Sequence, residues 1–119
     1  MADIQELRLI VKEIRANPAN WTQKWWGWRG RCGTSYCIAG HAVERAGYPM
    51  IWEPMVTGYR AGYCRMERGD RPIGEVAQQL LDLTAGQARL LFAGSNTLED
   101  IEALIGQWEA EQLAAESDE

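Results

Sequence analysis

The chain has 119 residues, a length that supports one hydrophobic core and not two. Hydrophobic residues make up 46% and charged residues 24%, which is ordinary globular composition and excludes a disordered chain. The sequence contains no run of about 18 apolar residues and no basic, apolar leader, so we expect no membrane partner and a cytoplasmic protein.

The net charge of −5 is unevenly distributed along the chain. Residues 1–71 contain 11 Lys and Arg against 7 Asp and Glu, whereas residues 72–119 contain one basic residue, Arg89, against 10 acidic ones. Ten of the twelve basic residues are arginine, which favours planar, bidentate contacts. The basic part either complements the acidic part within one fold or meets an anion or an acidic partner.

The first predicted helix spans residues 4–16 and is capped by Asp3. Its apolar stripe consists of Ile4, Leu7, Val11 and Ile14. The pair Asn17-Pro18 ends this helix, since the residue before a proline disfavours helical geometry. A short second helix is predicted to follow, with Asn20 as its cap and Gln23 three residues later completing a capping box.

The middle of the chain is predicted to contain one helix and one irregular segment. Either residue of Thr34-Ser35 can cap a helix over about 36–46, and Gly47 stands where a left-handed C-terminal cap is expected. Gly40, inside this helix, indicates close packing against a neighbouring segment. Residues 48–71 are punctuated by Gly and Pro and are predicted to form an irregular loop or a weak hairpin.

Three more helices are predicted in the last part of the chain. Asp70 and Pro72 open a helix over residues 73–82, and Thr84 with Gln87 forms a capping box for a short helix that ends at Phe92. Residues 97–100 cap the last helix, and the acidic tail at 114–119 is expected to fray. The stripe of the last helix consists of Ile101, Leu104, Ile105 and Trp108.

These elements predict an all-α fold, in which five or six short helices form one compact domain over residues 1–113. Its predicted core consists of Leu7, Val11, Ile14, Trp25, Cys37, Ile38, Val43, Leu80, Leu83, Leu91, Phe92, Ile101 and Leu104.

Two motifs carry a resemblance to known sequences. Residues 32–42 read Cys-Gly-Thr-Ser-Tyr-Cys-Ile-Ala-Gly-His-Ala, and residues 81–92 contain Leu-x-Leu-Thr-x-x-Gln-Ala-x-x-Leu-Phe. Together they resemble a group of small proteins encoded by actinobacterial phages, prophages and some bacterial genomes. The resemblance implies a bacterial cytosol and carries no activity. In that group the position of His41 is often Trp, which implies a structural role for this part of the chain.

The cysteines and the single histidine admit several kinds of chemistry. Cys37 and His41 are one helical turn apart, and Cys32 and Cys64 could complete a tetrahedral zinc site. A disulfide between Cys32 and Cys37, a reactive Cys32 at a helix start, and three free thiols with a core histidine are the alternatives. We expect free thiols and no cofactor, with zinc as a possible exception.

An unusual cluster of aromatic and basic residues precedes the first motif. Trp21, Trp25, Trp26 and Trp28 lie beside Lys24, Arg29 and Arg31. A helix cannot bury all four rings, so we expect Trp21 and Trp25 inside and Trp26 or Trp28 partly exposed. Exposed Trp, Tyr and Arg are typical of binding hot spots. The candidate partner-binding residues are Trp26, Trp28, Arg29, Arg31, Tyr59, Arg60 and Tyr63.

No nucleotide-binding loop, catalytic carboxylate pair or distant base for a nucleophile is present in the sequence, so we expect no enzyme. The predicted function is that of an interaction protein, phage or prophage encoded, that binds and modulates a host protein. A small nucleotide or anionic-ligand binder using the same Trp/Arg surface and a zinc-stabilised structural module are the alternatives. A helix-turn-helix around Asp82 would offer only Gln87 and Arg89 to DNA from an acidic region, so duplex DNA is not expected.

Overall fold

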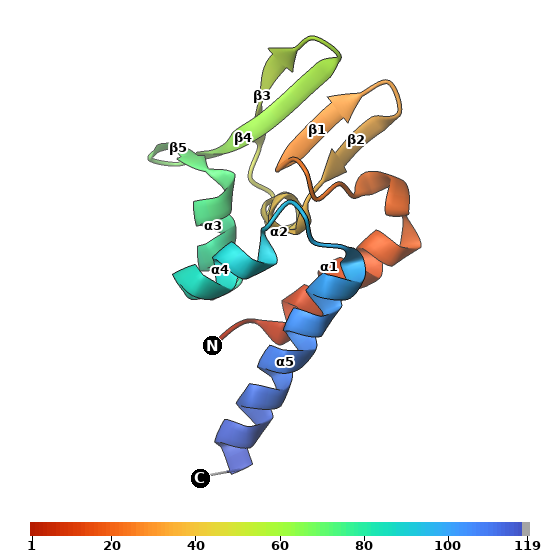
Figure 1. Ribbon diagram of the computed structural model, residues 1–119. Coiled ribbons are helices and arrows are strands. Elements are labelled where there is room, and N and C mark those ends of the chain that lie inside the picture. The colour runs from red at the N-terminus through yellow and green to blue at the C-terminus, as the bar shows by residue number, and fades with distance from the viewer. Residues whose placement is uncertain (118–119) are drawn as a thin grey trace.

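In the computed structural model, which describes residues 1–117, a five-stranded antiparallel sheet rises from a body of five α-helices (Figure 1). The predicted all-α fold is therefore wrong, and the fold is a mixed one. The helices are α1 (Ile4–Ala16), α2 (Ile38–Arg45), α3 (Ile73–Leu80), α4 (Ala85–Leu91) and α5 (Leu98–Ser117), with a 3-10 turn, η1 (Pro18–Asn20). The strands are β1 (Gly27–Gly30), β2 (Gly33–Tyr36), β3 (Met50–Met55), β4 (Gly58–Met66) and β5 (Gly69–Pro72).

The helices with strong capping signals begin where the sequence predicts. The side chain of Asp3 accepts the N–H of Glu6 at the start of α1, and Asn17 follows its last residue. Thr84 and Gln87 form the capping box of α4, and the Thr97 hydroxyl accepts the Asp100 N–H at the start of α5. Because each cap satisfies N–H groups that a helix start leaves without partners, these signals act locally and can be read from sequence.

The segment before α2 differs from the prediction. Residues 31–32 form a two-residue turn that joins β1 to β2, and Gly33 adopts a φ of 107° that favours glycine. The proposed cap Thr34-Ser35 therefore lies within a strand, and α2 begins only at Ile38. The predicted helix after Asn20 is also absent among residues 1–117, because Gln23 is buried and its side-chain amide donates to the carbonyls of Leu91 and Ala93.

Residues 48–71, predicted as a loop or weak hairpin, form three of the strands. β3, β4 and β5 follow one another through two-residue turns and belong to the five-stranded sheet, so the prediction of an irregular loop or weak hairpin is wrong. β3 pairs along one edge of β4, and β1 and β5 share the other edge. Ile51 pairs with Tyr63 but Trp52 pairs with Ala61, so Gly62 is the extra residue of a β-bulge.

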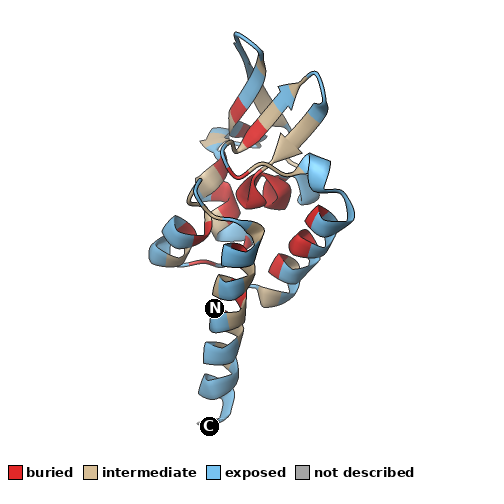
Figure 2. Ribbon diagram, turned by 45° about the vertical axis from the view of Figure 1, so that its right-hand side comes forward, coloured by how far each residue is buried: buried red, intermediate tan, exposed pale blue. Residues whose placement is uncertain are grey.

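Helix α2 lies directly beneath the sheet and is the most deeply buried element (Figure 2). A Cβ added to Gly40 would stand 1.9 Å from the carbonyl oxygen of Trp26. The N–H of Cys37, just before α2, donates to the carbonyl of Trp25 at 3.1 Å. The close packing that Gly40 predicts is therefore confirmed, and it joins α2 to the segment that enters β1.

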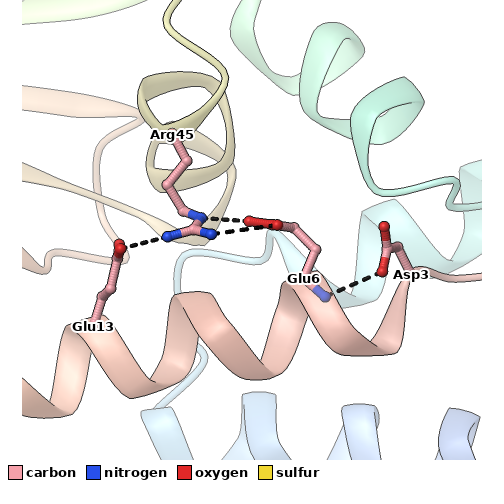
Figure 3. A network of polar contacts seen from close by, with 4 residues as sticks. All are labelled: Asp3, Glu6, Glu13 and Arg45. Atoms are coloured by element: carbon pink, nitrogen blue, oxygen red, sulfur yellow. Dashed lines mark hydrogen bonds and ion pairs between the residues drawn. The ribbon is translucent and has the colours of Figure 1, made fainter.

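The helical body is held together by apolar packing and by ion pairs between helices. Arg45 of α2 contacts both Glu6 and Glu13 of α1 (Figure 3). Nine of the predicted core residues are buried: Leu7, Val11, Ile14, Cys37, Ile38, Val43, Leu83, Leu91 and Ile101. Phe92 and Leu104 are partly buried and pack against this core, whereas Trp25 lies outside it and Leu80 is exposed, so the predictions for Trp25 and Leu80 are wrong.

Helix α5 leaves the body on the side away from the sheet (Figure 1). It continues through residues 114–117 of the predicted acidic tail, and residues 118–119 lie outside the described part of the chain. Within residues 1–117, no helix combines the length and the apolar character needed to cross a membrane.

Candidate functional site

The strand register separates the side chains of the sheet into two faces. Trp28 of β1 pairs with Arg60 of β4, which in turn pairs with Glu53 of β3. Paired residues of antiparallel strands place their side chains on the same face. We call this the outer face. The inner face, which carries Tyr36, Ala61 and Trp52, is turned toward α2, since the ring of Tyr36 packs edge-on against His41 at 5.5 Å.

A groove of about 350 Å³ lies on the outer face and is called the aromatic groove below. It is lined by Lys24, Trp25, Trp26, Glu53, Arg60, Ala61, Gly62 and Tyr63. The bulge at Gly62 shapes it, because the extra residue allows Arg60 and Tyr63 to line the groove while Ala61 and Cys64 are both buried. A Cβ added to Gly62 would have no atom within 4 Å, so the space beside the bulge is open.

Three aromatic side chains, those of Trp25, Trp26 and Tyr63, line the aromatic groove. The rings of Trp25 and Trp28 stack with their centroids 5.1 Å apart, and the Lys24 ammonium lies 5.6 Å from the centroid of Trp25. Trp26 packs edge-on against Phe92, the residue that follows α4, so this side of the groove contacts the helical body. Tyr63 is 48% exposed and offers a free ring face or edge.

The predicted binding residues are divided among three places. Trp26, Arg60 and Tyr63 line the aromatic groove, and Trp28 stacks beside it. Arg29 and Tyr59 belong to the inner face, where the Arg29 guanidinium lies 4.3 Å from the centroid of the Trp52 ring. Arg31 lies in the turn between β1 and β2. Composition drew attention to these residue types, whereas the strand register decides which of them share a face.

Sequence reasoning missed Lys24, Trp25, Glu53 and Gly62. Trp25 was assigned to the core on helical spacing, but residues 22–26 are not helical and its ring lies on the outer face. The alternation of the strands could have revealed Glu53 opposite Arg60, whose Nη2 lies 3.6 Å from a Glu53 carboxylate oxygen.

The sheet lobe, defined as residues 21–36 and 50–72, contains seven basic and three acidic residues. Only Arg60 and Arg71 of these seven have a carboxylate within 4 Å among residues 1–117. The basic residues without such a partner are Lys24, Arg29, Arg31, Arg65 and Arg68. The lobe therefore combines half-exposed aromatic rings with uncompensated positive charge.

The cysteines and the histidine are not brought together. Cys32 is exposed in the β1–β2 turn, while Cys37 and Cys64 are buried as free thiols. Burial raises the pKa of the Cys37 thiol to about 11 and also raises the pKa of Cys64. Residues 1–117 contain no group of three or more His, Cys, Asp or Glu that could hold a metal ion.

His41 has a structural environment beneath the sheet. Its Nε2 lies 3.0 Å from the carbonyl oxygen of Asn20, so this nitrogen carries the proton and donates. Burial lowers the pKa of His41, although that hydrogen bond and the nearby carboxylates of Glu13 and Glu44 oppose the shift. The ring is thus kept neutral and in contact with the backbone, away from the aromatic groove.

No protein-family model, curated protein or solved structure matches this chain. The geometry of the outer face is therefore the basis on which its chemistry can be judged. Flat aromatic surface, guanidinium and ammonium groups and a groove are suited to holding an anionic ligand by stacking and ion pairing.

Proposed function

We propose that this chain is a non-enzymatic binding module that holds an anionic partner on the outer face of its sheet lobe. The observation that carries the proposal is that Lys24 and Arg65, which have no carboxylate partner within residues 1–117, lie on the outer face with the partly exposed rings of Trp25, Trp28 and Tyr63. Uncompensated charges repel one another in the free protein, and an anion would relieve that repulsion. Exposed aromatic rings beside arginine are the composition of binding hot spots.

The positions of the nucleophilic and basic residues support binding rather than catalysis. His41, the only histidine of the sequence, is buried and donates to the backbone at Asn20. The thiol of Cys37, with a pKa of about 11, is protonated at neutral pH. Neither group lines the aromatic groove. Of the two partners considered from the sequence, a nucleotide meets the requirement for negative charge, and a host protein would meet it through an acidic segment.

Retention on heparin, a sulfated polysaccharide, tests the proposal, because an acidic protein binds this polyanion only through a local basic surface. We expect the chain to be retained at low salt despite its net charge of −5. The double variant Lys24→Gln/Arg65→Gln should elute at lower salt.

The matched control is Lys12→Gln/Arg89→Gln, which removes the same charge from two residues of the helical body that also lack an ion pair within residues 1–117. Its elution should be unchanged. Flow-through of the unmodified chain at low salt, or an equal shift in both double variants, would contradict the proposal.

A further inference from the structure

We infer that the anionic partner is a single-stranded nucleic acid, bound across the outer face with its bases at the aromatic groove and its phosphates on the surrounding cations. This inference rests on the proposed function and names its partner. It is carried by one juxtaposition: Tyr63 and the stacked Trp25–Trp28 pair lie on the same sheet face as Lys24 and Arg60, around a groove of about 350 Å³.

The aromatic rings provide surfaces for unpaired bases. Tyr63, which is 48% exposed, and Trp25, which stacks on Trp28, both line the groove. Bases stack on such rings without sequence preference, because every base has a π-face. A duplex keeps its bases paired and stacked inside, so these rings could not reach them.

The cations are placed where the backbone of such a strand would run. Lys24 and Arg60 line the groove, and Arg65 of β4 lies two residues beyond Tyr63, on the same side of the alternating strand. From Tyr59 to Met66 the strand extends about 23 Å, which is long enough for several nucleotides. The acidic helix α5 runs away from the sheet (Figure 1), so the carboxylate that lines the groove is that of Glu53, whose contact with Arg60 a phosphate would replace.

An acidic peptide would satisfy the cations but would leave the aromatic rings without a matching planar group. A nucleic acid strand supplies both the negative charge and the flat apolar rings. The combination of stacked tryptophans, an exposed tyrosine and unpaired basic residues therefore favours single-stranded nucleic acid over an acidic protein segment.

The test is fluorescence anisotropy of labelled oligonucleotides titrated with the full chain. The probes are single-stranded DNA and single-stranded RNA of about 12 nucleotides and mixed sequence, with the matching duplex as a third probe. We expect the single strands to bind more tightly than the duplex. If Lys24, Arg60 and Arg65 each contact a phosphate, the logarithm of the affinity should fall with the logarithm of salt with a slope of about −2.

Three variants locate the binding surface. Tyr63→Ala should weaken binding by about 5- to 150-fold, the range for loss of one stacked base. Gly62→Leu should block the groove without straining the backbone, because its φ is not in the left-handed region and its Cβ meets open space. Arg65→Gln should lower the salt slope by about 0.7.

Tyr59→Ala is the matched control, since Tyr59 is on the same strand, is also 48% exposed and faces the opposite side. Its affinity should be unchanged, and urea unfolding should show that every variant is folded. Preference for either DNA or RNA agrees with the inference. Equal affinity for duplex, or no effect of Tyr63→Ala, would overturn it.

Two further results would overturn the inference while leaving the proposed function intact. Poly-glutamate that binds with the same dependence on Tyr63, when the oligonucleotides do not bind, would assign the groove to an acidic protein segment. A concentration-dependent dimer that Tyr63→Ala abolishes, again without oligonucleotide binding, would assign the groove to a second copy of the chain. Failure on heparin as well would remove both proposals.

Discussion

In the helical body, Arg8, Arg15 and Arg45 each contact a carboxylate on another helix, whereas most basic residues of the sheet lobe contact none within residues 1–117. The body, which comprises residues 1–20, 37–49 and 73–117, has an excess of acidic residues, and the lobe has an excess of basic ones. Charges in the body therefore join helices to one another. Those in the lobe are directed to solvent, where they can meet a ligand.

The glycines of the two regions differ in the same way. Gly40 of α2 and Gly74 of α3 stand against Trp26, and a Cβ at either position would overlap with it. Gly62 of the lobe faces open space. Close packing thus fixes the body and its junction with the sheet, while the outer face is left uncovered. A change at the junction should reduce stability, and a change on the outer face should reduce binding.

The largest expected effect is on the junction. Gly40→Ala should lower the free energy of unfolding by about 3 kcal/mol or more, because the Trp26 carbonyl is backbone and cannot move aside as a flexible side chain can. Urea denaturation measures the change. In the control Gly106→Ala on α5, the Cβ meets no atom within 4 Å, and a gain of up to about 1 kcal/mol is expected from helix propensity. Equal stability of the two variants would refute this view of the junction.

Thiol reactivity should distinguish the exposed tip of the lobe from the buried interior by a factor of a hundred or more in rate, on the order of 3 kcal/mol. Cys32 at the tip of the lobe is exposed, whereas Cys37 and Cys64 are buried. With a pKa of about 11, only about one Cys37 thiol in a thousand is ionised at pH 8. A chromogenic disulfide reagent should therefore titrate one thiol in the native protein and three in denaturant. Rapid reaction of two or three native thiols would show that the junction opens readily.

The helical body was largely predictable from sequence because its signals are local. Asp3, Thr84 and Thr97 each satisfy N–H groups within the first turn of the helix that follows, and the apolar stripe of α1 repeats at helical spacing. These contacts depend on neighbours three or four residues away in the chain, so no knowledge of tertiary structure is needed to find them.

The sheet was missed because its signals depend on pairing between distant segments. Gly30 and Gly33 flank a two-residue turn, but the sequence between them reads equally well as a loop before a capped helix. On β4, the bulge at Gly62 puts the buried residues Ala61 and Cys64 three apart, which hides the period of two expected for a strand.

For the same reason, composition could suggest the residue types of the candidate site but not which of them lie on one face. Arg29 with Tyr59 and Arg60 with Tyr63 are pairs of the same two residue types. Only the strand register shows that the two pairs lie on opposite faces of the sheet. The distribution of charge along the sequence likewise indicated only that an anion could meet the basic residues somewhere within residues 1–71. The structure narrows this to the lobe, because the arginines of α1 and α2 already have carboxylate partners.

A smaller effect is expected from removing an ion pair of the body. Arg45→Gln breaks contacts with Glu6 and Glu13 and should lower the free energy of unfolding by about 1 kcal/mol, less at high salt, because these groups are partly exposed (Figure 3). Arg65→Gln, which removes an unpaired cation of the lobe, should leave stability unchanged while weakening retention on heparin. If both variants lost the same stability, the proposed difference between the charges of the body, which stabilise the fold, and those of the lobe, which bind a ligand, would be wrong.

The smallest effect concerns the pH dependence of the junction. Burial lowers the pKa of His41 below its ordinary value of 6.5, so between the two values the unfolded chain binds more protons than the folded one. The contribution of His41 to stability is therefore complete above pH 6.5 and is lost as the pH falls toward its lowered pKa. Urea unfolding between about pH 8 and pH 5 should show this decline superimposed on the titration of carboxylates.

His41→Gln isolates the histidine, since its amide can still donate to the Asn20 carbonyl but does not titrate. The difference in stability between the unmodified chain and this variant should shrink or reverse as the pH falls below 6.5. Nucleic acid binding, compared between pH 8 and pH 7, should not change, because His41 lies beneath the sheet and does not line the aromatic groove. A pH-independent difference in stability would mean that His41 takes up its proton as easily in the folded chain as in the unfolded one. The junction would then be more open to water than the burial of α2 indicates.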